Sequence, residues 1–515
     1  MKRNIFKSLS LMFCTLLMAA CSINRGDSDA YIGVIPNDAM LVSKVDAGAL
    51  LEKSDVQNNT LVKVEFEKAV AELTDAQKAL LKGVFANPKA AGVDVDAPVY
   101  IALVGVEPLN FVATARMNDV TVFENMLSTF IEDGLEIKEY EGLKYIPFYE
   151  EETSLEGGQM ALAYDADRII FVADECNSDL FSHIALPAEK SAVNDARFAS
   201  LFKNDDDVVF AVNYEPLVQF MIKEKMVDRE LIPFVAMAKE GMMFSSLDFE
   251  NGYFTLNVIT EMPDEYRTLY KEFMQESTRR HYAYIPDNAF LAMSHKLNMF
   301  QLYDILGATG LLKELEKNGV NNDVAKELLV ALSGDYSAAV WVNSNELEDA
   351  EFMVAVDCSD RSLFDLLVAY LLFELNAQTV EEDVYSLFDE YCLMYKDGAI
   401  MLMPKGLYAK VKADDGLKPL KKNLNSNTLF KAPNDVVFDL KPIRKILLDV
   451  ICSDDKMSQE QAVAMELLNV VDNITVDTDI DNYTIRVNTT NKKINSLKYI
   501  LDKMIGLAVR NAAMH

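Results

Sequence analysis

The sequence is poor in the side chains that most enzymes and metal proteins use. It holds one Trp and four His among 515 residues, and the His stand far apart, at His183, His281, His295 and His515. This dispersion excludes a short-range metal motif. The GxGxxG, P-loop, GxSxG and HExxH signatures are absent as well. We therefore expect no catalytic residue, no metal ligand and no cofactor.

Basic residues are also scarce. Lys and Arg total 49 against 81 Asp and Glu, which gives a formal net charge of −32. An acidic surface of this kind repels the phosphate backbone of nucleic acids and anionic lipid headgroups. Nucleic acid is thereby excluded as a partner. The charge by itself indicates a well-solvated surface rather than a function.

Cysteine does not occur in the patterns of redox or disulfide-rich proteins. The six Cys form no CxxC pair and no dense framework. Cys358 and Cys392 fall on predicted strands and could form a disulfide in an oxidising compartment. We expect free buried thiols instead, because Cys packs readily as a small hydrophobic residue.

Beyond the first 21 residues, no apolar run is long enough to cross a membrane. The longest, residues 366–375, is about half the length that a spanning helix needs, and it is flanked by Asp365 and Glu374. We expect this run to be a buried helix.

The most specific signal lies at the N-terminus. Residues 1–20 combine a basic start, an apolar run and a small-residue ending, as is typical of a secretory signal peptide. The LMAAC ending at Cys21 resembles a bacterial lipobox, which implies a diacylglycerol on Cys21. An ordinary signal peptide with an incidental Cys is the alternative. We expect residues 21–30 to tether a globular body to the outer membrane, on its surface or its periplasmic face.

A repeated pattern organises the rest of the chain. The stretch IPNDAMLVSK at residue 35 restarts as IPDNAFLAMS at residue 285, each placing Pro and Asn or Asp before an apolar run. Strand and helix signals then recur in the order β, α, β, β, α, opening near residues 40, 207, 290 and 435, with hairpin-like strands between the paired copies.

This pattern predicts an internally duplicated α+β fold. It would have mainly antiparallel sheets, helices on one face and four βαββα-like units. We expect a first domain over residues 31–280, with two such units and added hairpins. A second domain with two units and one hairpin is expected over residues 281–515.

One pair of neighbours suggests a hydrolase. Ser294 and His295 are residue types that serve as nucleophile and base. Neighbours on a strand point to opposite faces, so the two side chains cannot form the necessary hydrogen bond. We expect His295 to be structural.

An aspartate series suggests a calcium loop. Asp477, Asp479 and Asp481 have the spacing of the first ligands. Asn482, however, stands in place of the turn Gly, and Asn488 in place of the bidentate Glu. A β-hairpin is therefore the favoured interpretation.

The remaining candidates are charged runs and the single Trp. Acidic runs at residues 150–152, 205–207 and 381–383 could bind cations, and the Lys-rich stretch 418–422 could contact an anionic surface. We expect all of them to be solvated loop residues. Trp341 lies in an apolar strand and is expected in the core.

Four features together suggest a family. The lipobox at Cys21, the IPND strand entry at residues 35–38, the passage 92–100 and the Ser-Gly-Asp at 333–335 resemble an uncharacterised family of Bacteroidota envelope lipoproteins, known as a domain of unknown function. The resemblance would span nearly the whole mature chain. It implies an envelope lipoprotein of gut-type anaerobes and transfers no active-site residue.

The sequence therefore favours a membrane-anchored lipoprotein with a non-catalytic binding or scaffolding function. Its partner would be an unknown protein or small molecule, with a sheet face or a cleft as the contact surface. An envelope hydrolase whose catalytic residues converge only in three dimensions is the alternative.

Overall fold

The structure is a computed structural model. It describes residues 29–105, 109–130, 137–149, 159–174, 184–227, 241–261, 264–308, 312–313, 322–374, 377–388, 390–413, 434–452, 458–479 and 482–514. The described residues form two compact units. The first lies within Met1–Val227, Val235–Glu261 and Asn491–His515, and the second within Asp228–Phe234 and Met262–Thr490.

The first unit is built on one antiparallel sheet. Its strands, in the order in which they pair, are β4 (Lys138–Tyr140), β5 (Leu143–Tyr149), β6 (Gln159–Tyr164), β7 (Arg168–Asp174), β3 (Asn110–Arg116), β2 (Val99–Val104), β1 (Ala39–Val45), β8 (Val208–Asn213), β9 (Met242–Glu250) and β10 (Tyr253–Glu261).

Helices lie between these strands in the chain, and one more, α19, closes the chain after the second unit. They are α2 (Ala47–Ser54), α3 (Thr60–Ala69), α4 (Asp75–Ala86), α5 (Val120–Phe130), α7 (Ala199–Lys203), α8 (Tyr214–Lys223) and α19 (Ser496–Met514), with short 3₁₀ turns such as η1 (Asp29–Val34). Thr74 and Gln77 form a capping box that starts α4, because their side chains satisfy each other's free backbone N–H groups.

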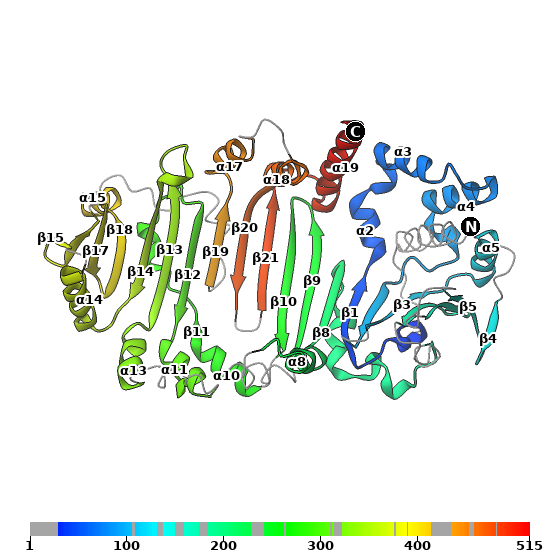
Figure 1. The fold of residues 1–515 in the computed structure, drawn as a ribbon, viewed down its shortest axis with the longest axis horizontal. Helices are drawn as coiled ribbons and strands as arrows, with labels where there is room; N and C mark the ends of the chain where they lie inside the picture. Colours follow the sequence, from blue (N-terminus) through cyan, green and yellow to red (C-terminus); the bar gives the residue numbers. More distant parts are fainter. Residues whose placement is uncertain are drawn as a thin grey trace. The chain divides into compact units, whose positions relative to one another are not determined.

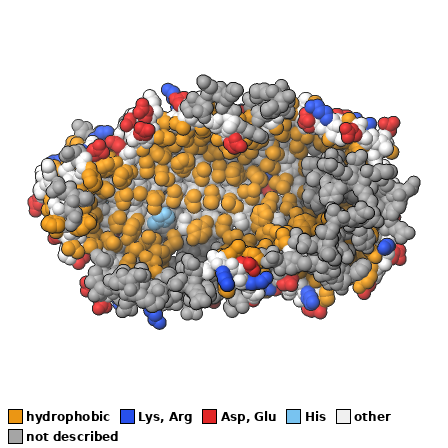
Figure 2. All heavy atoms as spheres, in the orientation of Figure 1, with side chains coloured by type: hydrophobic (Ala, Val, Ile, Leu, Met, Phe, Trp, Pro, Cys, Tyr) orange, Lys and Arg blue, Asp and Glu red, His pale blue; other side chains and the backbone are white. Residues whose placement is uncertain are grey.

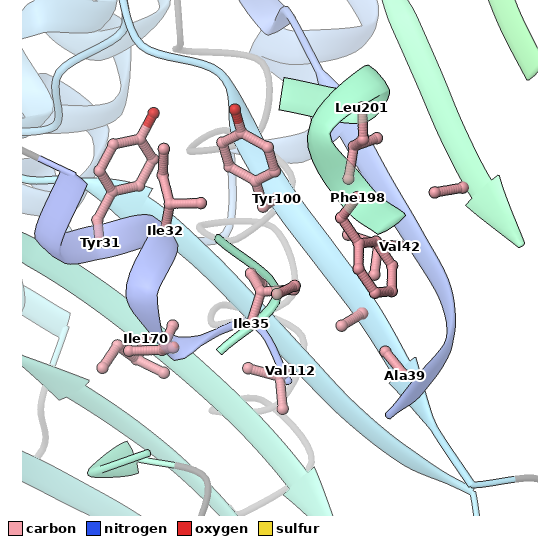
Figure 3. Close-up of a cluster of buried hydrophobic side chains, with 14 of the residues drawn as sticks. Tyr31, Ile32, Ile35, Ala39, Val42, Tyr100, Val112, Ile170, Phe198 and Leu201 are labelled. Carbon is pink, nitrogen blue, oxygen red and sulfur yellow. The ribbon is translucent and has the colours of Figure 1, made fainter. Parts of the chain in front are cut away.

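A hydrophobic core covers one face of this sheet (Figure 3). Val42, Tyr100 and Val112 project from neighbouring strands, and the residues that follow η1 place Ile35 against them. Ile35, the first residue of the IPND strand entry, is fully buried. The motif therefore serves packing.

The second unit is built in the same way. Its strands, in pairing order, are β15 (Gln378–Glu381), β16 (Val384–Leu387), β17 (Tyr391–Lys396), β18 (Ala399–Pro404), β14 (Ala350–Asp357), β13 (Gly334–Val342), β12 (Leu291–Leu297), β19 (Asn434–Asp439), β20 (Val471–Thr478) and β21 (Asn482–Thr489). The short β11 (Met274–Gln275) pairs with the end of β12.

The helices of the second unit are α10 (Asp264–Phe273), α11 (Met299–Ala308), α13 (Asn322–Ala331), α14 (Arg361–Glu374), α15 (Lys405–Ala413), α17 (Arg444–Ile451) and α18 (Gln459–Val470). Figure 1 shows α11 and α13 near one end of the strands β12 to β14, and α17 and α18 near the opposite end of β19 and β20.

The expected division into four βαββα units is wrong. In the first unit, β1 pairs with β2 of its own expected copy and also with β8 of the next copy. In the second unit, β12 likewise pairs with both β13 and β19. A strand carries hydrogen-bonding groups on both edges, so a neighbour on each side satisfies them and joins two copies into one sheet. In each unit, ten of the described strands follow the same pairing order.

The expectation of helices on one face is also wrong. Leu393 and Met394 are neighbours on β17 and so point to opposite faces of the sheet. Leu393 packs in a cluster with Phe364 of α14, whereas Met394 packs in a cluster with Leu407 of α15. Helices thus cover both faces of this end of the sheet.

Within the apolar run at residues 366–375, residues 366–374 belong to α14 and are not buried on all sides, while residue 375 lies outside the described residues. Phe364 and Val368 of α14 are buried, whereas Leu366 and Phe373 are 66% and 84% exposed. The prediction of a buried helix is therefore wrong for one face. Among the described helices, none is long and apolar enough to cross a membrane.

Candidate functional site

The neighbours Ser294 and His295 lie on opposite faces of β12, as the strand geometry predicted. The Ser294 hydroxyl is fully buried and lies 2.7 Å from the hydroxyl of Ser277. His295 is paired across the strands with Tyr336. The two side chains cannot act as nucleophile and base. His183 and His515 lie outside the described residues.

His281 makes a contact that sequence spacing did not predict. Its Nε2 lies 2.9 Å from Oδ1 of Asp357, and the ring is 1% exposed. The same carboxylate binds the guanidinium of Arg280, whose Nε lies 2.8 Å from Oδ1. Burial tends to raise the pKa of Asp357, but hydrogen bonds from His281 and Arg280 lower it overall.

This contact does not form a nucleophilic site in the described part of the chain. Nδ1 of His281 is buried and has no hydrogen-bond partner there. The adjacent Cys358 thiol donates to the carbonyl of Asp360, and burial raises its pKa. Arg280 also donates to the carbonyl of Asp397. The arrangement therefore ties η8 (Arg280–Tyr284) to β14 and to the β17–β18 turn.

The aspartate series at the end of β20 belongs to a hairpin. The backbone N–H of Asp479 donates to the carbonyl of Asn482 at 2.8 Å, which closes the β20–β21 turn. Asp477 is on β20 and its Oδ1 is buried. Asp481 lies outside the described residues. The hairpin interpretation is confirmed.

One of the acidic runs is not solvated. Asp207 is 2% exposed, and its carboxylate accepts hydrogen bonds from Lys53 and from the backbone N–H of Phe249, both at 2.8 Å. Lys53 also contacts Asp248 at 2.7 Å. The prediction of a solvated loop end is wrong for Asp207, because a buried carboxylate requires such partners.

The run at residues 381–383 pairs with basic residues of neighbouring helices. Asp383 binds the guanidinium of Arg361 on α14, and Glu381 binds the ammonium group of Lys412 on α15. The runs at 150–152 and 418–422 lie outside the described residues.

The interpretations of Trp341 and the Cys residues are confirmed. Trp341 is 2% exposed, and its indole N–H donates to Glu351 at 2.8 Å. Cys358 and Cys392 are buried free thiols, and Cys452 is an exposed free thiol. Cys21, the expected lipidation site, lies outside the described residues.

The most extensive candidate for a binding surface is one face of the second unit's sheet, which we name the apolar sheet face. Residues that pair across antiparallel strands share a face. Successive pairings therefore define three rows: Phe352, Val340, Leu291, Phe438, Ile474 and Val487; Leu402, Val354, Ala338, Met293, Val436, Val476 and Ile485; and Ile400, Val356, Tyr336 and His295.

Most of these apolar side chains are partly exposed to solvent, although they lie in adjacent rows. Phe352 and Val354 are 38% and 36% exposed, and nearly all the others are partly exposed. Figure 2 shows hydrophobic side chains spread over the strands of the second unit, with charged side chains towards its rim. Contiguous apolar patches of this kind mark interaction sites.

The apolar sheet face carries no charged side chain at neutral pH. His295 is its one ionisable basic group, and burial lowers the pKa of the imidazole. Burial likewise raises the pKa of the Tyr336 hydroxyl to about 12. The backbone groups of paired strands are used within the sheet. A ligand on this face is therefore held by apolar contact.

One row of the corresponding face in the first unit is more polar. Its equivalent row contains Ser43 on β1 and Ser245 on β9 at the places that Met293 and Val476 occupy in the second unit. Since the strand order is the same, the apolar character of the second unit is not a requirement of the fold.

A buried polar cluster lies on the opposite face of β12, β13 and β19. Asp335 accepts hydrogen bonds from Ser277 at 2.8 Å and from the Thr278 backbone at 3.0 Å. Asp435 is fully buried and lies 3.2 Å from the guanidinium of Arg279. Sequence reasoning missed this cluster, although polar residues alternating with apolar ones on β12 and β13 are its visible signal.

A family model described as a domain of unknown function (DUF4836) matches residues 31–403. The chain belongs to this family. The match includes β12, β13 and β14 of the apolar sheet face. Neither a curated protein nor a solved structure matches the sequence. The expected resemblance to a domain of unknown function is confirmed, while the Bacteroidota origin and the lipoprotein character stay predictions.

Proposed function

We propose that this chain is a non-catalytic binding protein of the cell envelope, anchored in the outer membrane by a lipid on Cys21. It binds an apolar ligand on the apolar sheet face of its second unit. The observation that carries this proposal is the set of adjacent cross-strand rows of partly exposed apolar side chains.

The chemistry of the face defines the ligand class. Phe352, Val354 and Met293 offer dispersion contacts over a broad surface, and no fixed charge is present to orient a polar group. Acyl chains and other extended hydrocarbons suit such a surface. The negative charge of the whole protein disfavours anionic amphiphiles.

The competing proposal of an envelope hydrolase has one supporting observation, the contact between His281 and Asp357. The carboxylate is shared with Arg280, and the free imidazole nitrogen contacts no described hydroxyl or thiol. Binding without catalysis is therefore the better supported function.

Titration with the neutral fluorophore N-phenyl-1-naphthylamine tests the binding proposal. We expect saturable binding, and we expect Val354→Asp to weaken it by about tenfold or more, because a buried apolar side chain contributes roughly 1.5–3 kcal/mol. Val330→Asp on α13 is the matched control, since Val330 is 45% exposed and lies outside the apolar sheet face. Equal binding by both variants would contradict the proposal.

A further inference from the structure

The helix α14 has an apolar side that faces solvent. Phe364 and Val368 point into the unit and are buried. Leu366, Tyr370 and Phe373, spaced four and three residues apart, lie together on another side and are 66%, 61% and 84% exposed. Polar residues are expected on the solvent side of a surface helix. We name this side, which also includes Ala369, the α14 stripe.

The first unit provides an internal comparison. Its helix α5 follows β3 as α14 follows β14, and each begins after an Asp whose carboxylate accepts from backbone N–H groups two or three residues on. Phe123 of α5 and Phe364 of α14 occupy the same place and are both fully buried.

The solvent sides of the two helices differ. Counted from the shared Phe, the positions of Leu366, Ala369 and Tyr370 in α14 hold Asn125, Ser128 and Thr129 in α5. Asn125 and Ser128 are exposed and polar, as expected for a solvated helix. The fold therefore tolerates polar residues at these helix positions. The apolar residues of the α14 stripe are not needed for folding, which indicates that they contact a partner.

A second copy of the chain does not suit the α14 stripe. A stable interface buries about 800 Å² and about 20 residues on each partner, whereas the stripe offers four side chains. Two copies would also each bring a net charge of −32. Like charges of this size oppose association.

A lipid surface suits it better. Exposed Phe, Tyr and Leu side chains on one side of a helix are the residues that enter the boundary between headgroups and acyl chains. They need no hydrogen-bonding partner there, and the Tyr370 hydroxyl can stay in the headgroup region. Figure 1 places α14 and β15 at the same end of the second unit's sheet, and Val380 of β15 is itself 49% exposed.

We propose that the α14 stripe inserts into the surface of a zwitterionic lipid bilayer, as a second membrane contact besides the lipid on Cys21. This inference rests on the proposed membrane anchoring. The anchor keeps the body at high local concentration near the bilayer, so a small apolar contact is sufficient to bind. Zwitterionic lipid is required because anionic headgroups repel the acidic surface.

Fluorescence quenching tests the contact directly. The full chain, purified from membranes with its lipid, is placed in phosphatidylcholine vesicles whose acyl chains carry bromine at defined depths. Phe373→Trp introduces an indole into the stripe. The buried Trp341 fluoresces in every variant, and its signal is measured in the parent chain and subtracted. We expect quenching by bromine, strongest at shallow positions, because interfacial helices lie roughly 5–10 Å deep.

Ser128→Trp on α5 is the matched control, and its indole should not be quenched. In the Phe373→Trp chain, the further changes Leu366→Asn and Tyr370→Thr install the residues of α5 and should abolish the quenching. They alter exposed side chains, and circular dichroism confirms the fold.

Two results would overturn the proposal. The first is an indole at position 373 that bromine does not quench, although mass spectrometry shows lipid on Cys21. The protein would then be anchored, but the α14 stripe would not contact the bilayer. The other is an indole that becomes shielded with rising protein concentration in the absence of vesicles, which assigns the stripe to a second copy. A Cys21 without lipid contradicts the anchoring separately.

Discussion

At the scale of single residues, Asp435 is a carboxyl group held away from water. Its carboxyl group is fully buried near the guanidinium of Arg279, the hydroxyl of Tyr282 and the carboxyl of Asp477. Burial raises its pKa from 3.8 to about 7, although Arg279 opposes the shift. A carboxyl group that titrates near neutrality makes stability depend on pH.

We expect the free energy of unfolding to fall as the pH rises from about 5 to 8. The carboxyl group of Asp435 binds its proton more tightly in the native chain than in the unfolded chain. The stabilisation that results is complete below pH 4 and is lost as the pH rises to 7. The loss attributable to Asp435 is about 2 to 3 kcal/mol between pH 5 and 8. Urea unfolding at several pH values measures it.

Asp435→Asn should flatten this pH dependence, because the amide does not titrate. Asp304→Asn, which changes an exposed residue of α11, is the matched control and should leave the dependence unaltered. If the free energy of unfolding changes with pH as steeply in Asp435→Asn as in the parent chain, Asp435 does not cause the pH dependence.

At the scale of helices and strands, local sequence patterns predicted most elements and their starts. The strands β1, β8, β9 and β10 lie where alternating apolar residues placed them. The exposed side of α14 was missed. Composition shows that a helix is apolar, but only the packed neighbours decide which of its sides they cover.

The start of helix α5 depends on Gly92, which stands far from it in the chain and contacts it in the fold. Gly92 has φ +78° and its carbonyl accepts from the N–H groups of Asn118 and Asp119 at 2.9 Å. A Cβ at this position would meet the Asp119 carbonyl oxygen at 2.5 Å and the Phe123 nitrogen at 2.6 Å. Both are backbone atoms and cannot move aside easily.

Gly92→Ala should therefore destabilise the protein by at least about 2 kcal/mol. Gly83→Ala within α4 is the matched control, since nothing lies within 4 Å of its added Cβ. There we expect a stabilisation of up to about 1 kcal/mol, because Ala has the higher helix propensity. Thermal unfolding of the two variants compares them, and equal melting temperatures would contradict the expectation.

At the scale of the whole molecule, two units repeat one order of ten strands. The repeat is visible in the sequence as the restart at residue 285. The surfaces of the units have diverged: polar side chains on α5 and at Ser245 stand where apolar ones occur on α14 and at Val476. The apolar surfaces on which the proposed ligand and lipid contacts rest therefore belong to the second unit.

The anchoring proposal also belongs to the whole molecule. Cys21→Ala should move the protein from the membrane fraction to the soluble fraction of its own cells, because a small interfacial contact does not hold a protein without its anchor. Fractionation followed by immunoblotting measures this. Firm membrane association of the variant would contradict a single lipid anchor, and Cys452→Ala, at an exposed thiol, is the control.

The sequence by itself determined most of the strands, the internal repeat and the opposite directions of Ser294 and His295. These follow from local periodicity and capping, which residues near in the chain encode. The tertiary structure alone decided that β1 and β8, and likewise β12 and β19, pair, that Asp207 and Asp435 are buried, and that the α14 stripe is open. Periodicity states which side chains share a face, but burial depends on segments distant in the chain that pack against that face.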